Sequence, residues 1–178
     1  MNSAEAQQLK KNYFWNTLGS LMTSLSSVLL LIVVTHTLGA ELGGIFSLAF
    51  AVGQQYQILG AFEMRPYQAT DIKGRFRFGT YLGSRYITCL AMLLAICCYA
   101  LWTYGISYVA GLAFSVAGLR FFDAAEDVFH GMFQQKGRLD IAGRALFLRS
   151  LTSTVTFTVV LIVTRDLLAT CIITALVS

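Results

Sequence analysis

Three long stretches without a charged side chain constrain what this chain can fold into. They are residues 14–35, 42–62 and 86–119. The first two contain 22 and 21 residues, close to the ~20 that an α-helix needs to cross the hydrocarbon core of a bilayer. The third contains 34 residues, which at ~1.5 Å of rise per residue is too long for one crossing. It must fold back, and the polar, turn-prone segment 103–105 is the expected bend.

Composition points to the same class of protein. Of the 178 residues, 56% are hydrophobic and 12% are charged, whereas a soluble domain carries about 25% charged residues. The mean hydropathy is +0.65. The sequence therefore predicts an all-α fold, a polytopic membrane helical bundle in contact with the lipid bilayer. The net charge of +4 does not indicate nucleic acid as a partner, because the basic residues lie at the ends of the expected helices.

The expected transmembrane part follows residues 1–12, which form an N-terminal segment outside the bilayer. Its helices cover residues 13–36, 42–63, 84–103, 106–133, 145–164 and 167–178. The last segment has twelve residues, too few to cross the hydrocarbon core. We therefore expect about six transmembrane helices with the sixth incomplete, in a fragment that ends inside a helix.

The distribution of Lys and Arg gives the expected orientation. Short cytoplasmic connections are enriched in these residues. One side of the expected membrane holds eleven: Lys10, Lys11, Arg65, Lys73, Arg75, Arg77, Arg85, Lys136, Arg138, Arg144 and Arg149. The other side holds only Arg165. The N-terminus and the 64–84 and 134–145 connections are therefore expected in the cytoplasm.

The helix expected at 106–133 carries an unusual polar face. Arg120, Asp123, Asp127, His130 and Gln134 fall within ~80° of arc, and Glu126 widens this arc to ~120°. A charge near the bilayer centre costs roughly 2.5–3.5 kcal/mol on insertion scales. Pairing at i,i+3, of Arg120 with Asp123 and of Asp127 with His130, would offset part of that cost.

Two interpretations of this face remain open. In the first, the charged residues form an ion-pair ladder that holds neighbouring helices together near the cytoplasmic end. In the second, they take part in the function of the protein. The acids outnumber the bases, so one carboxylate could exchange protons or bind a cation.

The first two expected helices carry milder polar faces. The first face consists of Asn12, Asn16, Gly19, Thr23, Ser26 and Ser27, and the second of Ser47, Gln54 and Arg65, with Gln57 at its edge. Small and hydroxylated residues let membrane helices pack closely. The alternative is that these faces line a wet cavity.

No pattern of enzymatic chemistry emerges. His36 and His130 lie in different expected helices without metal-ligand spacing. There is no G-x-S-x-G motif, phosphate-cradling glycine loop or Cys/His dyad. We expect no enzyme activity, catalytic residue, metal site or cofactor.

Two segments give the sequence a family resemblance. Residues 38–49, LGAELGGIFSLA, and the pattern D-x-x-x-D-x-F-x-G-x-F-Q over residues 123–134, followed by K-G-R at 136–138, carry it. They resemble the polysaccharide and oligosaccharide flippases, the lipopolysaccharide, O-antigen and capsule export proteins of the multidrug/oligosaccharidyl-lipid/polysaccharide superfamily. The resemblance extends from about residue 8 to the end of the chain.

The resemblance implies a fold and a function. Such flippases have two helical lobes around a central cavity and work by alternating access, so this chain would be the N-terminal lobe, with the second lobe of the same protein as its partner. The implied substrate is an undecaprenyl-pyrophosphate-linked glycan for cell-surface polysaccharide biosynthesis, moved across the bacterial inner (cytoplasmic) membrane. The candidate substrate-binding residues are Arg120, Arg65, Asn16 and Gln54, and the candidates for ion or proton coupling are Asp123, Asp127 and Glu126.

Other functions remain open at this point. A multidrug and toxin extrusion antiporter shares the two-lobed architecture. A membrane enzyme of glycan assembly usually has a sizeable extracytoplasmic loop, whereas the outer connections here are only a few residues long. A non-transporting scaffold would tolerate pairwise exchange of the charges in 106–133.

Overall fold

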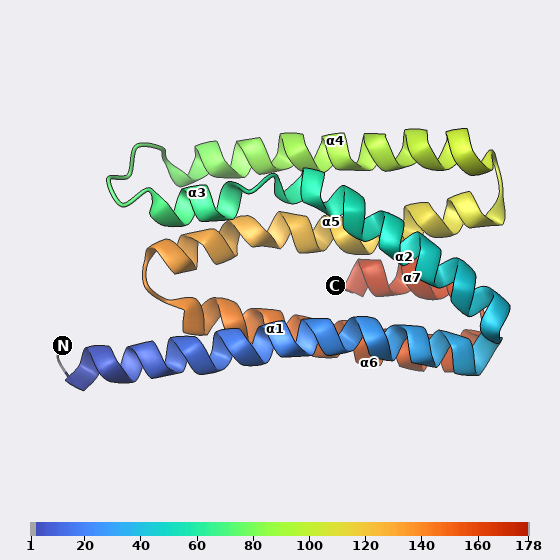
Figure 1. Ribbon diagram of the computed structural model, residues 1–178, viewed down its shortest axis with the longest axis horizontal. Coiled ribbons are helices and arrows are strands. Elements are labelled where there is room, and N and C mark those ends of the chain that lie inside the picture. Colours follow the sequence, from blue (N-terminus) through green and yellow to red (C-terminus); the bar gives the residue numbers. More distant parts are fainter. Residues whose placement is uncertain (1–2, 178) are drawn as a thin grey trace.

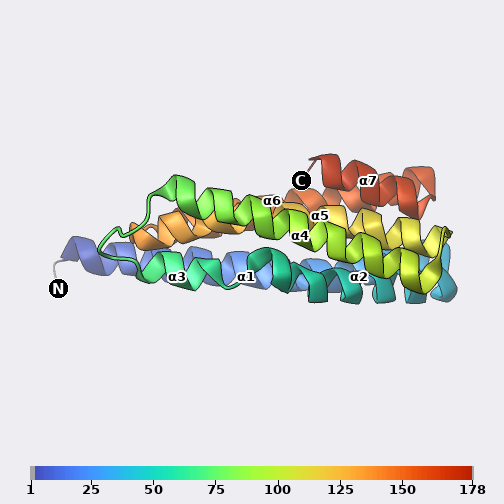
Figure 2. The same cartoon turned by 90° about the horizontal axis from the view of Figure 1, so that it is seen from above.

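The computed structural model describes residues 3–177, and every regular element within this range is an α-helix. In chain order they are α1 (Ser3–Leu38), α2 (Ala40–Ala61), α3 (Met64–Thr70), α4 (Phe78–Tyr104), α5 (Tyr108–Gln135), α6 (Leu139–Thr164) and α7 (Leu167–Val177). The long helices lie side by side along one axis (Figure 1). Figure 2 shows α1, α2 and α3 on one side of this bundle and α7 on the opposite side. The expected all-α fold class is confirmed.

Four helices are long and apolar enough to cross a membrane: α1, α4, α5 and α6. They make the chain compatible with a multi-pass membrane protein. The expected second crossing, 42–63, is also helical, as α2, but α2 is not among these four. Its three glutamines, Gln54, Gln55 and Gln57, lower its hydropathy.

The helices extend beyond the apolar stretches that predicted them. α1 begins at Ser3, ten residues before the expected start at 13, and α6 begins at Leu139 rather than 145. The expected bend at 103–105 is present, because α4 ends at Tyr104 and Gly105 has a φ of 60°. The Ser107 side chain then accepts a hydrogen bond from the Ala110 N–H at the start of α5.

The connections gather at the two ends of the bundle. The N-terminus and the α3–α4 and α5–α6 connections lie at one end, and the α1–α2, α4–α5 and α6–α7 connections lie at the other (Figure 1). Six of the eleven basic residues assigned to the first end lie within helices and five lie in the α3–α4 and α5–α6 connections. Arg85 and Arg149 are paired with acids of α5. Even without these two, nine basic residues oppose the single Arg165, so the asymmetry in charge remains.

The closest helix pairing is between α1 and α6. A Cβ atom at Gly143 would lie 2.4 Å from the carbonyl oxygen of Trp15, and one at Gly19 would lie 2.7 Å from the carbonyl oxygen of Gly143. Only glycine allows the backbones to approach this closely, as small residues do in membrane helix pairs.

Asn12 ties the ends of these two helices together. Its Oδ1 accepts a hydrogen bond from the Asp140 N–H at 3.0 Å, and its Nδ2 donates to the Gly137 carbonyl at 2.8 Å. Asn12, one member of the predicted polar face of the first helix, is therefore committed to capping α6.

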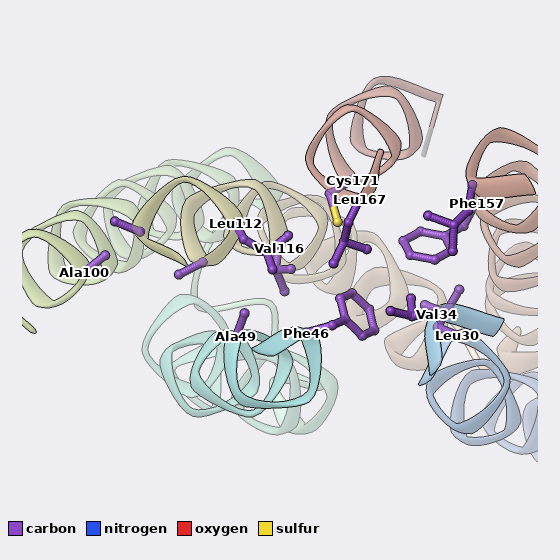
Figure 3. Close-up of a cluster of buried hydrophobic side chains, with 13 residues drawn as sticks. Leu30, Val34, Phe46, Ala49, Ala100, Leu112, Val116, Phe157, Leu167 and Cys171 are labelled. Atoms are coloured by element: carbon purple, nitrogen blue, oxygen red, sulfur yellow. The ribbon is translucent and has the colours of Figure 1, made fainter. Parts of the chain in front are cut away.

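Buried apolar side chains join six helices in one cluster (Figure 3). Leu30 and Val34 come from α1, and Phe46 from α2; the Phe46 ring lies 5.6 Å from that of Phe157 in α6. Residues of α4, α5 and α7 complete the cluster. This core fixes the relative positions of the helices that enclose the site described next.

The α3–α4 connection is held by one carboxylate. Asp71 accepts hydrogen bonds from the backbone N–H groups of Arg75 and Phe76, at 3.0 and 3.2 Å, and from the Tyr81 hydroxyl at 2.8 Å. These bonds, that from Arg75 N–H above all, lower the pKa of Asp71 below its ordinary value of 3.8. The connection thus has a defined conformation at neutral pH.

Candidate functional site

A polar cavity of about 160 Å³ lies between α1, α2, α5 and α6. Its walls combine hydroxyl groups, a few apolar side chains and three charged residues. The lining residues are Thr23, Ser24, Ser26, Ser27, Leu30, Phe50, Gln54, Leu119, Arg120, Asp123, Arg149, Ser150, Ser153 and Thr154. Polar residues of four helices, brought together by the α1–α6 pairing and by the packing of α2 on α5, thus meet in one space.

Three charged side chains meet at this cavity. Arg120 Nη1 donates to Asp123 Oδ2 at 2.7 Å, as the i,i+3 spacing predicts, and Arg149 of α6 donates from Nη2 to the other oxygen, Oδ1. The side chains are only 11–18% exposed. The Asp123 carboxylate is therefore clamped between two guanidinium groups from two helices.

Arg120 has two further features. Its guanidinium carbon lies 4.1 Å from the centre of the Phe50 ring, a cation–π contact with α2. Its Nε is buried and has no hydrogen-bond partner within residues 3–177. Arg120 is thus fixed in place while one of its donors stays unused.

The charges continue from the cavity along α5. Arg149 Nε also pairs with Glu126 Oε2, and Glu126 Oε1 lies 2.8 Å from His130 Nε2. The predicted pairing of Asp127 with His130 is wrong. His130 reaches the acid four residues before it, because Asp127 is engaged by arginines of α3 and α4.

Those arginines form a second cluster with Asp127. Arg85 Nη2 donates to Asp127 Oδ2 at 2.8 Å, and Arg65 Nη1 lies 3.5 Å from Asp127 Oδ1. Arg85 is 1% exposed and also donates to the carbonyls of Gly60 and Ala61 at the end of α2. The cluster satisfies carbonyls that a helix C-terminus leaves open, so it connects α2, α4 and α5.

The structure brings only part of the predicted site together. Arg120, Gln54 and Asp123 line the cavity. Arg65 and Asp127 lie in the second cluster. Asn16 lies at the close α1–α6 contact, where its backbone nitrogen would be 2.6 Å from a Cβ atom at Gly143.

Sequence reasoning missed Arg149 and Arg85 as site residues. Both were counted with the basic residues that set topology. A signal was nevertheless present, since three acids and one arginine on 106–133 leave a negative surplus that needs cations from other helices. The sequence alone does not say which arginines supply them.

An adjoining groove of about 570 Å³ runs between α4, α5 and α6. Its lining residues are Leu82, Arg85, Tyr86, Phe122, Ala125, Glu126, Phe129, Ala145, Leu148, Arg149, Thr152, Ser153 and Val177. Most of them are apolar. Arg85 and Glu126 add two charges to the groove, and Val177 of α7 also lines it. Arg149 and Ser153 line both the groove and the cavity, so these two side chains join the polar cavity to a mainly apolar groove.

The chemistry that this arrangement offers is binding of an anion beside hydroxyl groups. Two guanidinium groups can hold a carboxylate or a phosphate through paired hydrogen bonds. No group of three His, Cys, Asp or Glu side chains within residues 3–177 is placed to hold a metal ion. Comparison of the chain with protein-family models, curated proteins and solved structures gives no significant match.

Proposed function

We propose that this chain is one lobe of a flippase that moves a lipid-linked oligosaccharide from the cytoplasmic to the outer leaflet for cell-surface polysaccharide biosynthesis. The substrate would be a glycan on a polyprenyl pyrophosphate of the undecaprenyl type. Movement would be by alternating access between this lobe and a second lobe of the same protein. The membrane would be the bacterial inner membrane.

The observation that carries the proposal is the contact between the polar cavity and the apolar groove. A lipid-linked glycan has an apolar chain, a negatively charged pyrophosphate and sugar hydroxyls. The groove can hold the apolar chain, and the arginines can bind the pyrophosphate. Gln54 and the hydroxyl groups of the cavity can form hydrogen bonds with the sugar. Arg149 and Ser153 mark the point where such a substrate changes from apolar to charged.

The orientation is also part of the proposal. Nine Lys and Arg residues lie in or near the connections at the end that carries the N-terminus, against Arg165 at the opposite end. By the positive-inside rule the N-terminus is cytoplasmic. The segments at 38–49 and 123–138 that resemble polysaccharide flippases support the same assignment.

Within this proposal the residues have distinct roles. Arg120 binds the pyrophosphate, and Gln54 binds sugar. Asp123 and Glu126 are the acids placed to couple ion or proton movement to transport. Arg65, Asp127 and Asn16 lie outside the cavity, so their contribution would be to hold the helices in position.

The proposal is tested by Arg120→Ala in cells that carry the complete transporter with both lobes. Loss of a charge-assisted hydrogen bond costs about 1.5–3 kcal/mol, so we expect glycan export to fall at least ~10-fold while the protein still inserts in the membrane. The measurement is surface polysaccharide per transporter molecule. Arg77→Ala is the matched control, because Arg77 is an exposed arginine directly before the start of α4. Normal surface polysaccharide in the Arg120→Ala variant would contradict the assignment.

A further inference from the structure

We propose that Asp123 is an internal counter-ion that occupies a phosphate-binding site formed by Arg120 and Arg149 and leaves it when a substrate phosphate binds. The inference rests on the proposed function and deepens it. It names Arg149 as the second arginine of the site and assigns Asp123 the position that the phosphate takes.

The geometry of the carboxylate carries the first step. Each oxygen of Asp123 accepts from a different guanidinium group, Oδ2 from Arg120 and Oδ1 from Arg149. Two oxygens held by two arginines are also how proteins hold a phosphate group. The carboxylate therefore makes the contacts that two phosphate oxygens would make.

The burial of the arginines carries the second step. Their side chains are 11% and 18% exposed and come from two helices, so without an anion between them two positive charges would face each other with little solvent. Glu126 pairs with Arg149 but not with Arg120, whose acidic partner within residues 3–177 is Asp123. The Arg120 side of the site therefore needs a resident anion. Asp123 supplies it from within the chain, and a phosphate can take its place.

The third observation is that the site has an unused hydrogen-bond donor and free volume. Arg120 Nε is buried without a partner, although a guanidinium group has five donors. A phosphate offers more acceptor oxygens than a carboxylate and can use this donor. The cavity volume of about 160 Å³ exceeds the ~30 Å³ that one water molecule occupies in the liquid, so there is room for an anion of several atoms.

The second cluster provides an internal comparison. Asp127 also lies between two arginines, Arg85 and Arg65. That cluster does not line the cavity, and Arg85 is 1% exposed and also donates to the carbonyls of Gly60 and Ala61. Arg149 also has a second partner, Glu126, but it is 18% exposed and lines the cavity. Exchange for an external anion is therefore expected at Asp123 and not at Asp127.

The test is a binding titration with the protein in nanodiscs of uncharged phosphatidylcholine. The probes are inorganic pyrophosphate and farnesyl pyrophosphate, with farnesol as the control that lacks phosphate, and the readout is calorimetry. Asp123→Asn removes the competing charge but keeps the side-chain shape, so we expect both pyrophosphate probes to bind about tenfold more tightly than to the unmodified protein. Asp127→Asn is the matched control: it also weakens an ion pair with a buried arginine and lowers stability, but the folded variant should bind both probes as tightly as the unmodified protein does.

Variants of the two arginines should bind the pyrophosphate probes more weakly, in contrast to the Asp123 variant. Arg149→Gln and Arg120→Gln should each weaken binding about tenfold. Tighter binding of farnesyl pyrophosphate than of the inorganic probe would identify a lipid headgroup as the source of the phosphate, and equal binding would identify a free anion; both support the site. If Asp123→Asn does not fold, the titrations of Arg149→Gln and Arg120→Gln against the Arg77→Ala control decide the test.

Several outcomes would overturn the inference. They are absence of binding of either probe, no tightening with Asp123→Asn, equal tightening with Asp127→Asn, or unchanged binding by Arg149→Gln. None of these results depends on glycan export in cells. A failed phosphate site is therefore distinguishable from a failed flippase assignment, which the Arg120→Ala export measurement decides.

Discussion

At the scale of residues, each acid on α5 is matched by an arginine. Asp123 is held by Arg120 and by Arg149 of α6, and Asp127 is held mainly by Arg85 of α4. An unpaired charge on a helix that crosses a membrane is costly, and pairing offsets part of this cost. The same pairs also determine which helices lie next to α5.

Arg85→Ala should therefore destabilise the protein strongly. The substitution leaves Asp127 with one distant arginine, removes the side-chain donor to the Ala61 carbonyl, and leaves the Gly60 carbonyl with the Thr88 hydroxyl alone. Breaking a buried pair costs about 3 kcal/mol or more, measurable as a lower free energy of unfolding in detergent. The exposed Arg77→Ala should stay within about 0.5 kcal/mol of the parent, and equal losses in the two variants would contradict the burial of Arg85.

At the scale of elements, the pairing of α1 with α6 depends on two glycines. Gly19 and Gly143 allow the backbones to touch, and Asn12 closes the same contact at the start of α6. The hydroxyl groups of Thr23 in α1 and Ser150 in α6 lie 2.9 Å apart and extend the contact between these helices to the cavity. One wall of the candidate site is thus fixed by this helix pair.

Gly143→Ala tests this pairing. The added Cβ would lie 2.4 Å from backbone atoms of Trp15, and such overpacking costs typically 1–3 kcal/mol. Gly83→Ala is the control, because a Cβ there meets nothing within 4 Å and alanine favours the helix by up to ~1 kcal/mol. Thermal unfolding of both variants should give opposite shifts, and a Gly143→Ala variant as stable as Gly83→Ala would rule out the close approach.

The sequence predicted the elements better than their ends or partners. The lengths of the stretches without charged residues predicted the helices and the bend at 103–105. The i,i+3 spacing predicted the ion pair Arg120–Asp123. Both predictions succeeded because they depend only on residues close together in the sequence. The start of α1 at Ser3 was not predicted, because a search for apolar stretches does not detect a helical segment made mostly of polar residues. The roles of Arg149 and Arg85 were missed because ion pairs between helices depend on tertiary packing, which periodicity within one helix does not report.

At the scale of the whole molecule, the bundle has a basic end and an end with a single Arg165. Between these ends, apolar side chains such as Ile87 and Val155 are more than half exposed, 72% and 53%. An outer surface of this kind suits lipid rather than water. With its long helices across a membrane, the bundle has its two ends in different compartments.

Cysteine labelling of the two ends tests that arrangement. In a variant without the four native cysteines, Ile106→Cys in the α4–α5 connection and Ile72→Cys in the α3–α4 connection are both exposed positions. With the N-terminus in the cytoplasm, a membrane-impermeant maleimide should label Ile106→Cys in intact cells and Ile72→Cys only after permeabilisation. The reverse pattern would invert the proposed topology.

The most direct test of the account concerns one turn of α1 in the same cysteine-free background. Ser27 lines the polar cavity, whereas its neighbour Val28 is 55% exposed on the outer surface. If the cavity is a water-accessible space inside a membrane-embedded bundle, a small hydrophilic thiol reagent should react with Ser27→Cys and leave Val28→Cys unmodified in intact membranes. Equal reaction at both positions would show that this part of α1 is not covered by lipid, and reaction at Val28→Cys alone would show that the cavity is not the aqueous side of the helix.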